Sequence, residues 1–365
     1  MASLAVVTNL PNPYRVPLFN LLSERAAEAG WRLEVVFGSR TNRRRQWKLD
    51  DRAFRFPHRY LEAPNVDLAP DRVVNTYRGI GKALGEIAPD AIVTTGFSLG
   101  SVTVMRFAQR RSIPWAIWSG AVSGREPGWL RRRQRRWLVR RADAFLAYGS
   151  AARDYLVELG AQPERVRCAW NTVDTSRFLA LPGARTPAPG EPLRLLSVGY
   201  LEYGKRIDLL LDTIARADEP VVLDIVGDGS ERVGLEAHAR KLGLGDAVRF
   251  HGYKANTELG PYYANAHAFA FPTQYDVWGL ALLEAMAAGL PALASPRAGA
   301  TRDLVVEGET GFAVEFTDPA HAAESLSRLR STGIAEMGKA ARNRIERHFT
   351  LERSADAWQE LLSEW

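Results

Sequence analysis

The stretch from Pro272 to Pro291, PTQYDVWGLALLEAMAAGLP, constrains the fold of this chain more than any other. Between Gly279 and Ala288 it is almost wholly apolar and rich in Ala and Leu, which favours a helix. A helix that is apolar all round is a buried one. Gly289 and Pro291 follow and predict where it ends. The stretch therefore predicts a short helix inside the core of a domain.

Two carboxylates interrupt this apolar stretch. Glu284 falls inside the predicted helix, where a carboxylate is costly unless something bonds it. Asp276 precedes the helix entry at Trp278, Gly279 and Leu280, whose free N–H groups make a natural anion site. Two acids around a helix N-terminus match a nucleotide sugar, which has hydroxyls at both ends and a diphosphate between them. In the alternative interpretation both acids are structural: Asp276 only caps the helix, and Glu284 forms an ion pair with a buried arginine.

Length and composition indicate a globular protein of two domains. The chain has 365 residues, 46% of them hydrophobic and 25% charged. The single cysteine, Cys168, excludes an internal disulfide framework and fits a reducing compartment, where we interpret it as a small core residue. The N-terminus has no basic region and predicts a buried strand, not a signal peptide. No run of 18 apolar residues is present, so we expect a cytoplasmic protein without a membrane span.

Charge is divided unevenly between the two halves. Residues 1–180 hold 29 Lys+Arg against 16 Asp+Glu, a net charge of +13, whereas residues 181–365 have a net charge of −7. The basic half is expected to meet something acidic. Nucleic acid is not the expected partner, because no nucleic-acid module pattern is present and the basic runs lack regular aromatic interleaving. A basic cluster within residues 40–60, comprising Arg40, Arg43, Arg44, Arg45 and Lys48 around Trp47, is interpreted as a solvated irregular excursion.

Short apolar runs alternate with helical patterns along the whole chain, which predicts two doubly wound parallel sheets. Proline and glycine concentrate in LPGARTPAPGEP, residues 181–192, which predicts a linker. We therefore expect domains at residues 1–180 and 193–348, followed by a C-terminal helix at residues 349–365. The expected strands are Leu4–Thr8, Trp31–Phe37, Ala91–Thr95, Pro114–Trp118, Phe145–Tyr148 and Val166–Trp170, then Leu193–Val198, Val221–Val226, Val248–His251, Ala268–Phe271 and Ala292–Ser295.

The acidic stretch resembles the signature of the retaining family 4 glycosyltransferases, whose motif is an acid, seven residues and a glutamate. Here it reads Asp276-Val277-Trp278-Gly279 and closes on Glu284, with Asp in place of the usual first Glu and Val in place of the usual Gly. The resemblance implies the GT-B fold, with two Rossmann-like domains facing a central cleft. It also implies that the C-terminal helix crosses back to the first domain. The implied activity is hexosyl transfer in carbohydrate biosynthesis.

The second domain carries further positions of the donor site. Lys205 begins a predicted helix, where a cation opposes the helix dipole unless an anion sits nearby. In the family this loop gives an Arg and a Lys to the donor phosphates; Lys205 matches the Lys, and Tyr200 stands where the Arg is usual. Arg206 is a candidate for the missing charge. The resemblance also implies that Gly252 and Tyr253 lie beside the base, and that Gly279, Leu280 and Gly299 contact the donor.

The loop NLPNPYR, residues 9–15, follows the first strand, at the end where open α/β sheets bind ligands. It resembles the acceptor-side loop of these transferases, which makes Asn12 and Arg15 candidate acceptor ligands. The alternative is a turn shaped by its prolines with a solvated Arg15. Many relatives place a histidine after the later strand that ends near Trp118; here Ser119 stands instead, and we take it as the acceptor-side candidate.

The segment GWLRRRQRRWLVRRAD, residues 128–143, predicts a helix with Trp129, Leu130, Trp137 and Leu138 on one face and arginines elsewhere. This is the composition of an interfacial helix, so peripheral contact with an anionic membrane is one hypothesis. The other is that the tryptophans pack on the sheet and the arginines are solvated.

The predicted function is retaining transfer of a sugar from a nucleotide sugar to an acceptor hydroxyl, on a lipid-linked glycan or a small natural product. Lys205 stabilises the leaving diphosphate, Asp276 orients the sugar hydroxyls and Glu284 holds the ribose. No metal or other cofactor is expected, since the histidines show no ligand spacing. Two alternatives stay open: a nucleotide-sugar 2-epimerase of similar architecture, and an inactive sugar-nucleotide binding protein.

Overall fold

The computed structural model describes residues 1–40, 50–61, 65–69, 72–75, 77–124 and 128–365. The chain divides into two compact units. Unit 1 combines Met1–Asp174 with Leu351–Trp365, and unit 2 is Thr175–Thr350. The change of unit falls at Asp174, ahead of the boundary at residue 180 that composition predicts, so residues 181–192 are part of unit 2.

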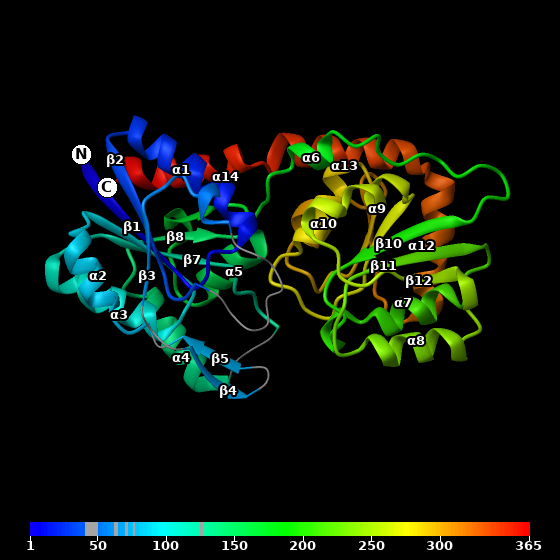
Figure 1. Ribbon diagram of the computed structural model, residues 1–365, viewed down its shortest axis with the longest axis horizontal. Helices are drawn as coiled ribbons and strands as arrows, with labels where there is room; N and C mark the ends of the chain where they lie inside the picture. Colours follow the sequence, from blue (N-terminus) through cyan, green and yellow to red (C-terminus); the bar gives the residue numbers. More distant parts are fainter. Residues whose placement is uncertain (41–49, 62–64, 70–71, 76, 125–127) are drawn as a thin grey trace. The chain divides into compact units, whose positions relative to one another are not determined.

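Unit 1 contains a seven-stranded parallel sheet in the order β3-β2-β1-β6-β7-β8-β9, with helices on both faces (Figure 1). The order reverses between β1 and β6, where neighbouring loops diverge and open sheets bind their ligands. The strands are β1 (Ala2–Thr8), β2 (Trp31–Phe37), β3 (His58–Tyr60), β6 (Ala91–Thr95), β7 (Trp115–Ser119), β8 (Ala144–Ala147) and β9 (Val166–Cys168). The helices are α1 (Val16–Glu28), α2 (Ile80–Ile87), α3 (Leu99–Arg111), α4 (Gly128–Val139), α5 (Ser150–Glu158) and α14 (Leu351–Ser363).

Residues 50–60 are more regular than the sequence predicts. β3 pairs in parallel with β2 at the sheet edge, and Arg40 forms an ion pair with Asp51. An antiparallel hairpin of β4 (Asn65–Ala69) and β5 (Arg72–Asn75) and the helix α2 follow, none of which the sequence pattern predicts. The remaining residues of the basic cluster, Arg43, Arg44, Arg45, Trp47 and Lys48, lie outside the described residues.

The C-terminal helix α14 completes the core of unit 1. It lies beside α1 (red against blue in Figure 1), where Arg25 of α1 bonds Asp356 and Gln359, each at 2.8 Å. Trp358 is buried and its ring meets that of Trp118 in β7 edge to face, with centroids 5.1 Å apart. The last residues of the chain thus contribute core packing to a sheet that the first residues form.

Unit 2 contains a six-stranded parallel sheet in the order β12-β11-β10-β13-β14-β15, which reverses between β10 and β13. The buried motif helix is α10, as the sequence predicts, and six of its residues are buried, Glu284 among them. The strands are β10 (Leu193–Val198), β11 (Val221–Val226), β12 (Val248–Phe250), β13 (Ala268–Phe271), β14 (Ala292–Ala294) and β15 (Gly311–Ala313). The helices are α6 (Ser176–Leu179), α7 (Ile207–Ile214), α8 (Arg232–Lys241), α9 (Gly260–Asn265), α10 (Leu280–Ala287), α11 (Thr301–Leu304), α12 (Pro319–Thr332) and α13 (Ile334–His348).

Candidate active site

Lys205 and Asp276 meet at the switch point of the unit 2 sheet. The loop after β10 carries Lys205 and the loop after β13 carries Asp276, so the sheet order brings together residues 71 positions apart in sequence. The Lys205 Nζ donates to Asp276 Oδ2 at 2.6 Å and lies 5.3 Å from the ring centroid of Phe271. Backbone bonding supports this meeting, because the Gln274 amide donates to the Gly204 carbonyl at 2.9 Å.

Asp276 also anchors the entry to helix α10. Its Oδ1 accepts from the Trp278 amide at 3.2 Å, and its carbonyl accepts from the Gly299 amide at 2.9 Å. The two acid oxygens therefore hold the cation of one loop and the backbone of another. Gly299, predicted to contact the donor sugar, is bonded directly to this residue. Because the Trp278 amide precedes the helix, which begins at Leu280, Asp276 is not the helix cap that the structural alternative supposed.

Helix α10 begins where the backbone demands glycine. Gly279 precedes the helix with φ +127°, and a Cβ there would lie 2.9 Å from the Phe271 ring. No side chain among the described residues caps this end, which leaves the amides at Gly279 and Leu280 to face an anion. Because Lys205 and Gly279 both lie against Phe271, cation and helix start belong to one site.

Glu284 is the buried carboxylate of this helix, with 6% of the residue exposed. Its Oε2 accepts from the hydroxyl of buried Tyr263 in α9 at 2.9 Å. Burial raises the pKa of Glu284 to about 7, against which the Tyr263 bond and the positive charge of Arg177 act. Its bonding partner is therefore a tyrosine instead of the buried arginine that the structural alternative supposed.

Glycines let the loops after β10, β11 and β12 pack backbone against backbone. A Cβ on Gly227 would lie 1.8 Å from the Gly199 carbonyl oxygen, and one on Gly229 would lie 2.3 Å from that of Leu201. The Gly227 amide also donates to the Gly252 carbonyl at 2.9 Å. At the carboxyl edge of the sheet these glycines leave the backbone without side chains, so a bulky ligand can approach the backbone closely.

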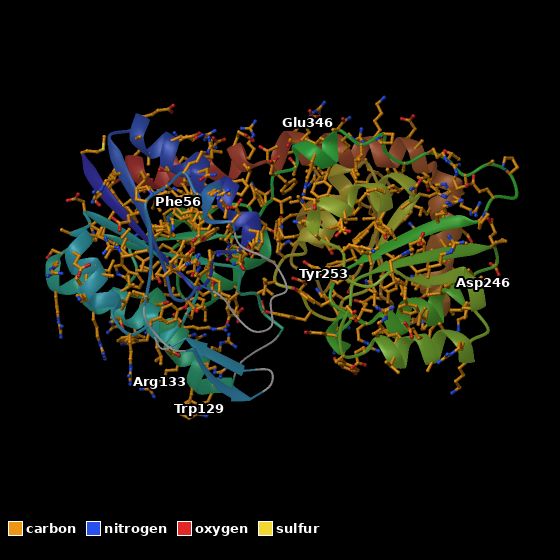
Figure 2. The ribbon with its side chains drawn as sticks, viewed as in Figure 1. Phe56, Trp129, Arg133, Asp246, Tyr253 and Glu346 are labelled. Atoms are coloured by element: carbon orange, nitrogen blue, oxygen red, sulfur yellow. The ribbon has the colours of Figure 1, made fainter. Side chains whose placement is uncertain are left out.

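These loops also carry two tyrosines, Tyr200 and Tyr253. Tyr253, labelled in Figure 2, is 43% exposed. Its pKa is raised by burial first and then by Tyr200, which places the two phenols near each other. Tyr200 shares a small hollow with Gly199, Lys205 and Phe271. Both tyrosines therefore accompany Lys205 at the predicted donor edge, as flat surfaces suited to a ring.

Arg206 forms an ion pair with Asp208 and not with Asp276. Its guanidinium binds both carboxylate oxygens of Asp208, with Nε–Oδ1 at 3.0 Å and Nη2–Oδ2 at 2.9 Å. It lines a different hollow, with Gln274 and Arg297, from the one that Lys205 and Tyr200 line. In this state Lys205 is thus the cation next to Asp276, and Asp208 balances the charge that Arg206 carries.

On unit 1, the acceptor candidates Asn12, Arg15 and Ser119 are all buried at the carboxyl edge of the sheet. Arg15 donates to Thr8 Oγ1 at 3.3 Å and to the hydroxyl of Tyr148, and its guanidinium lies 4.5 Å from the Trp118 ring centroid. The solvated alternative for Arg15 is therefore wrong.

Ser119 and the residues around it are held tightly in this edge. The Ser119 hydroxyl accepts from the Ala121 amide at 3.1 Å. A Cβ on Gly120 would lie 2.2 Å from the Tyr148 ring, so glycine is needed for this close approach. Tyr148, which sequence reasoning missed, follows β8 and binds Arg15. Its position just beyond a buried strand was the available signal.

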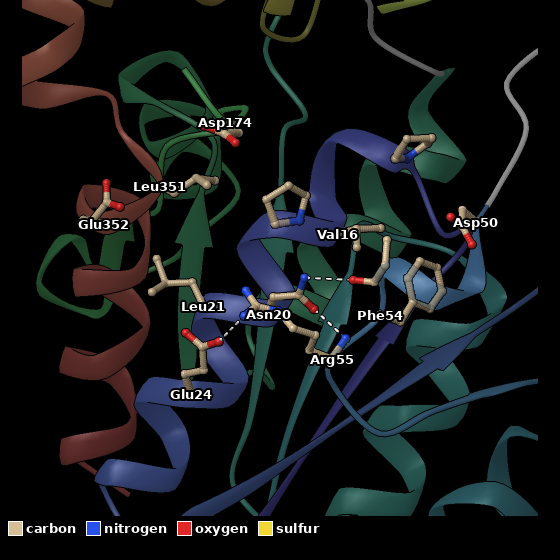
Figure 3. A pocket seen from close by; sticks show the side chains of 13 residues that line it. Val16, Asn20, Leu21, Glu24, Asp50, Phe54, Arg55, Asp174, Leu351 and Glu352 are labelled. Carbon is tan, nitrogen blue, oxygen red and sulfur yellow. Dashed lines mark hydrogen bonds and ion pairs between the residues drawn. The ribbon is translucent and has the colours of Figure 1, made fainter. Parts of the chain in front are cut away.

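A hollow in the described part of unit 1 lies beside these residues without including them. It has a volume of about 600 Å³ and is lined from α1, from residues 50–55 and from Asp174, Leu351 and Glu352 (Figure 3). Asn20 donates to the Ala53 carbonyl and accepts from the Arg55 amide, and Arg55 pairs with Glu24 at 3.1 Å. Because these groups already satisfy one another, we do not place chemistry here.

Two kinds of feature are absent from the described residues. No group of three or more His, Cys, Asp or Glu side chains there is arranged to hold a metal ion. Among the helices in the described ranges, none has the length and apolar character required to cross a membrane.

Two family models match this chain. The model described as Glycosyl transferases group 1 matches residues 184–347, and that described as Glycosyl transferase 4-like domain matches residues 18–171. A glycogen synthase of Mycobacterium tuberculosis is 31% identical over 64% of this chain and 59% of its own length. A D-inositol 3-phosphate glycosyltransferase of Thermomonospora curvata is 34% identical over 52% of this chain and 49% of its own. The chain thus spans 59% of the length of the first relative and 49% of the length of the second.

Solved structures match over the full chain at low sequence identity. The lipopolysaccharide outer core galactosyltransferase WaaB has a TM-score of 0.78 at 18% identity, and HepE of Anabaena in complex with UDP has 0.79 at 18%, each covering 100% of both chains. These likenesses establish the fold, and the family models identify both halves. Residues 18–171 therefore belong to the glycosyl transferase 4-like domain and residues 184–347 to the glycosyl transferases group 1, and the fold that contains them is GT-B.

Proposed function

We propose that this protein transfers a sugar from a nucleotide sugar to an acceptor hydroxyl with retention of anomeric configuration. The observation that carries the proposal is the meeting of Lys205 and Asp276 beside the uncapped start of α10. Cation, carboxylate and helix amides are the groups that a diphosphate bonded to a sugar requires. The solved HepE structures in complex with UDP and with UDP-glucose are consistent with a donor of this class.

Catalysis in this proposal is mainly electrostatic. Lys205 and the α10 amides stabilise the charge that develops on the departing diphosphate. The acceptor oxygen bonds the anomeric carbon on the face where the bond to the phosphate oxygen breaks, and that phosphate oxygen takes the acceptor proton. Asp276 orients sugar hydroxyls while keeping Lys205 in place. Glu284 holds the ribose, with one carboxylate oxygen fixed by Tyr263.

The acceptor class follows less directly. The relatives' names include a glycogen synthase and a D-inositol 3-phosphate glycosyltransferase, which act on different kinds of acceptor. Buried Arg15, Asn12 and Ser119 of unit 1 are the acceptor-side residues in our proposal. A lipid-linked glycan and a small natural product are the two acceptor types to test.

Donor binding can be tested first, by thermal shift against a panel of nucleotides and nucleotide sugars, since a ligand that binds the folded state raises its stability. We expect one nucleoside diphosphate and its sugar to raise the Tm. Lys205→Ala should weaken that binding at least tenfold, because a charge-assisted bond is lost, whereas Lys241→Ala on the exposed end of α8 should not. Unchanged affinity in the Lys205 variant would overturn the donor assignment.

Product analysis separates transfer from the alternatives. With the donor identified, the anomeric coupling constant of the product by NMR reports retention or inversion. Conversion of the donor's own sugar without any acceptor would identify a 2-epimerase. Binding without turnover on either acceptor type would identify an inactive sugar-nucleotide binding protein.

A further inference from the structure

Helices α3 and α4 of unit 1 expose large apolar side chains at their starts. Trp129 is 71% exposed, Leu130 is 63% exposed, and Leu99 at the first position of α3 is 62% exposed. Leu138, predicted to share their face, is fully buried. The sequence-based expectation of one apolar face packed on the sheet is therefore wrong for the first turn of α4. Solvation of a tryptophan is unfavourable, so this exposure needs a reason.

The arginines of α4 fall into two sets. Arg132 pairs with Glu158, and Arg135 donates to the Tyr155 hydroxyl at 2.9 Å and lies over the Phe97 ring. These two fix the inner side of the helix to α5 and to the start of α3. They are structural, and their charge is already used.

The second set faces outward. Arg133 and Arg136 follow Trp129 at spacings of four and seven, so the three side chains form one stripe along the helix. Both arginines are exposed, and Figure 2 shows Trp129 and Arg133 at the outer edge of unit 1. Arg131 is exposed too, but its spacing of two from Trp129 places it on another side of the helix. We call Trp129, Leu130, Arg133 and Arg136 the α4 surface.

We infer that the α4 surface binds the face of an anionic membrane. Exposed arginines are favourable on a helix face in water, but an exposed indole is not. At a lipid interface both kinds of side chain are favourable. Tryptophan concentrates at the headgroup level of bilayers, and each arginine near an anionic leaflet adds attraction. The helix holds five arginines and no acid, in a half of the chain with a net charge of +13. Apolar and basic groups together match this partner better than nucleic acid, which the arginines alone would suit.

The surface is defined by unit 1 alone. One consequence rests on the proposed function: if the protein is a glycosyltransferase, its acceptor is held in the membrane to which unit 1 binds. Of the two acceptor types above, the lipid-linked one then fits.

Vesicle sedimentation of the full chain tests the inference. Vesicles of phosphatidylcholine alone are compared with vesicles that also contain phosphatidylglycerol, at low and at high salt. We expect binding only to the anionic vesicles, and weaker binding at high salt. Changing Arg133 and Arg136 to Gln should lower the affinity by roughly thirtyfold. The double variant Trp129→Ser, Leu130→Ser should also bind the anionic vesicles more weakly. Its binding should depend more strongly on salt than that of the wild type, because mainly the charged contacts are left.

Matched controls lie on unit 2. Arg240 and Arg249, both exposed, are changed to Gln to remove the same charge, and exposed Val233 is changed to Ser. Both controls should bind as the wild type does. Absence of binding at low salt, equal binding to neutral vesicles, equal losses in the controls, or preferential competition by duplex RNA would overturn the inference. Thermal shift with nucleotides on the same samples reports the donor site separately, so either hypothesis can fail alone.

Discussion

Lys205 and Asp276 hold each other in a partly shielded position, with 28% and 22% of their side chains exposed. An ion pair of this kind contributes little to stability. In our proposal its value is positional, because it keeps the cation beside the start of α10. Asp276 reaches both groups with its two oxygens, since one accepts from Lys205 and the other from the Trp278 amide.

Replacing Asp276 separates positioning from binding. Asp276→Asn keeps the size of the side chain and an oxygen for the Trp278 amide, but loses the charge that faces Lys205. We expect kcat to fall by roughly tenfold or more, with nucleoside diphosphate affinity changed much less, because that ligand carries no sugar to orient. Steady-state kinetics and titration of the diphosphate measure the two quantities. A loss of diphosphate affinity with kcat intact would move Asp276 away from the sugar.

Glu284 makes stability depend on pH. Its folded pKa of about 7 exceeds the ordinary value of 4.5, because burial disfavours the charged form. The fold thus prefers the protonated acid, so this residue's contribution is most favourable below about pH 4.5. That contribution declines as pH rises and is lost above about pH 7.

The substitution Glu284→Gln removes this dependence while keeping an acceptor for the Tyr263 hydroxyl. At pH 8 we expect the variant to unfold with a free energy on the order of 1–3 kcal/mol higher than the wild type, and at pH 4.5 the difference should vanish. Urea unfolding at both pH values measures it. A difference of the same size at both would show that ionisation of Glu284 is not the cause.

At the scale of elements, the start of α10 depends on one glycine. Gly279→Ala adds a Cβ at φ +127° and 2.9 Å from the Phe271 ring. We expect a loss of about 1–3 kcal/mol in the free energy of unfolding, together with weaker nucleotide binding, because the helix entry must shift. Gly85→Ala is the control: that glycine lies in α2 with open space around it, and alanine should stabilise the helix slightly. Equal effects in the two variants would contradict the assigned role of Gly279.

The elements that sequence predicts well are those with strong local patterns. Strands such as β2, β10 and β11 are mainly apolar, interrupted only by single polar residues, and fall at their predicted bounds, and α10 is recognisable from its composition. The hairpin of β4 and β5 and the short edge strand β3 lack such a pattern, so their pairing depends on the sheet beside them.

The site residues divide in the same way into those that lie in local motifs and those that do not. Asp276, Lys205 and Glu284 lie in motifs, but Tyr148 and Tyr263 act on Arg15 and Glu284 from 133 and 21 positions away. Nothing in the local sequence at these tyrosines indicates those partners.

For the whole molecule, α14 decides whether unit 1 is complete. Trp358→Ala removes a buried indole from beside Trp118, which should lower the free energy of unfolding of unit 1 by about 3–5 kcal/mol. Ending the chain at Thr350 should cost more, because the Arg25 contacts to Asp356 and Gln359 are lost too. In both, unit 2 should keep its affinity for nucleotide. Limited proteolysis with mass spectrometry identifies which unit is cleaved.

A chain ended at Glu364, which retains the contact of that residue with Arg167, is the control and should resist protease as the wild type does. Protection of unit 1 in the chain that ends at Thr350 would contradict the role of α14.

The membership of α14 in unit 1 also orders events during synthesis. The ribosome makes the seven strands of the unit 1 sheet before unit 2, and makes α14, which packs beside α1, β8 and β9, after it. Unit 2 is one continuous segment and can finish folding as soon as it has emerged. Until α14 emerges, the apolar surface around Trp118 stays uncovered. During that interval the nascent chain carries a binding surface for chaperones at the sheet made first.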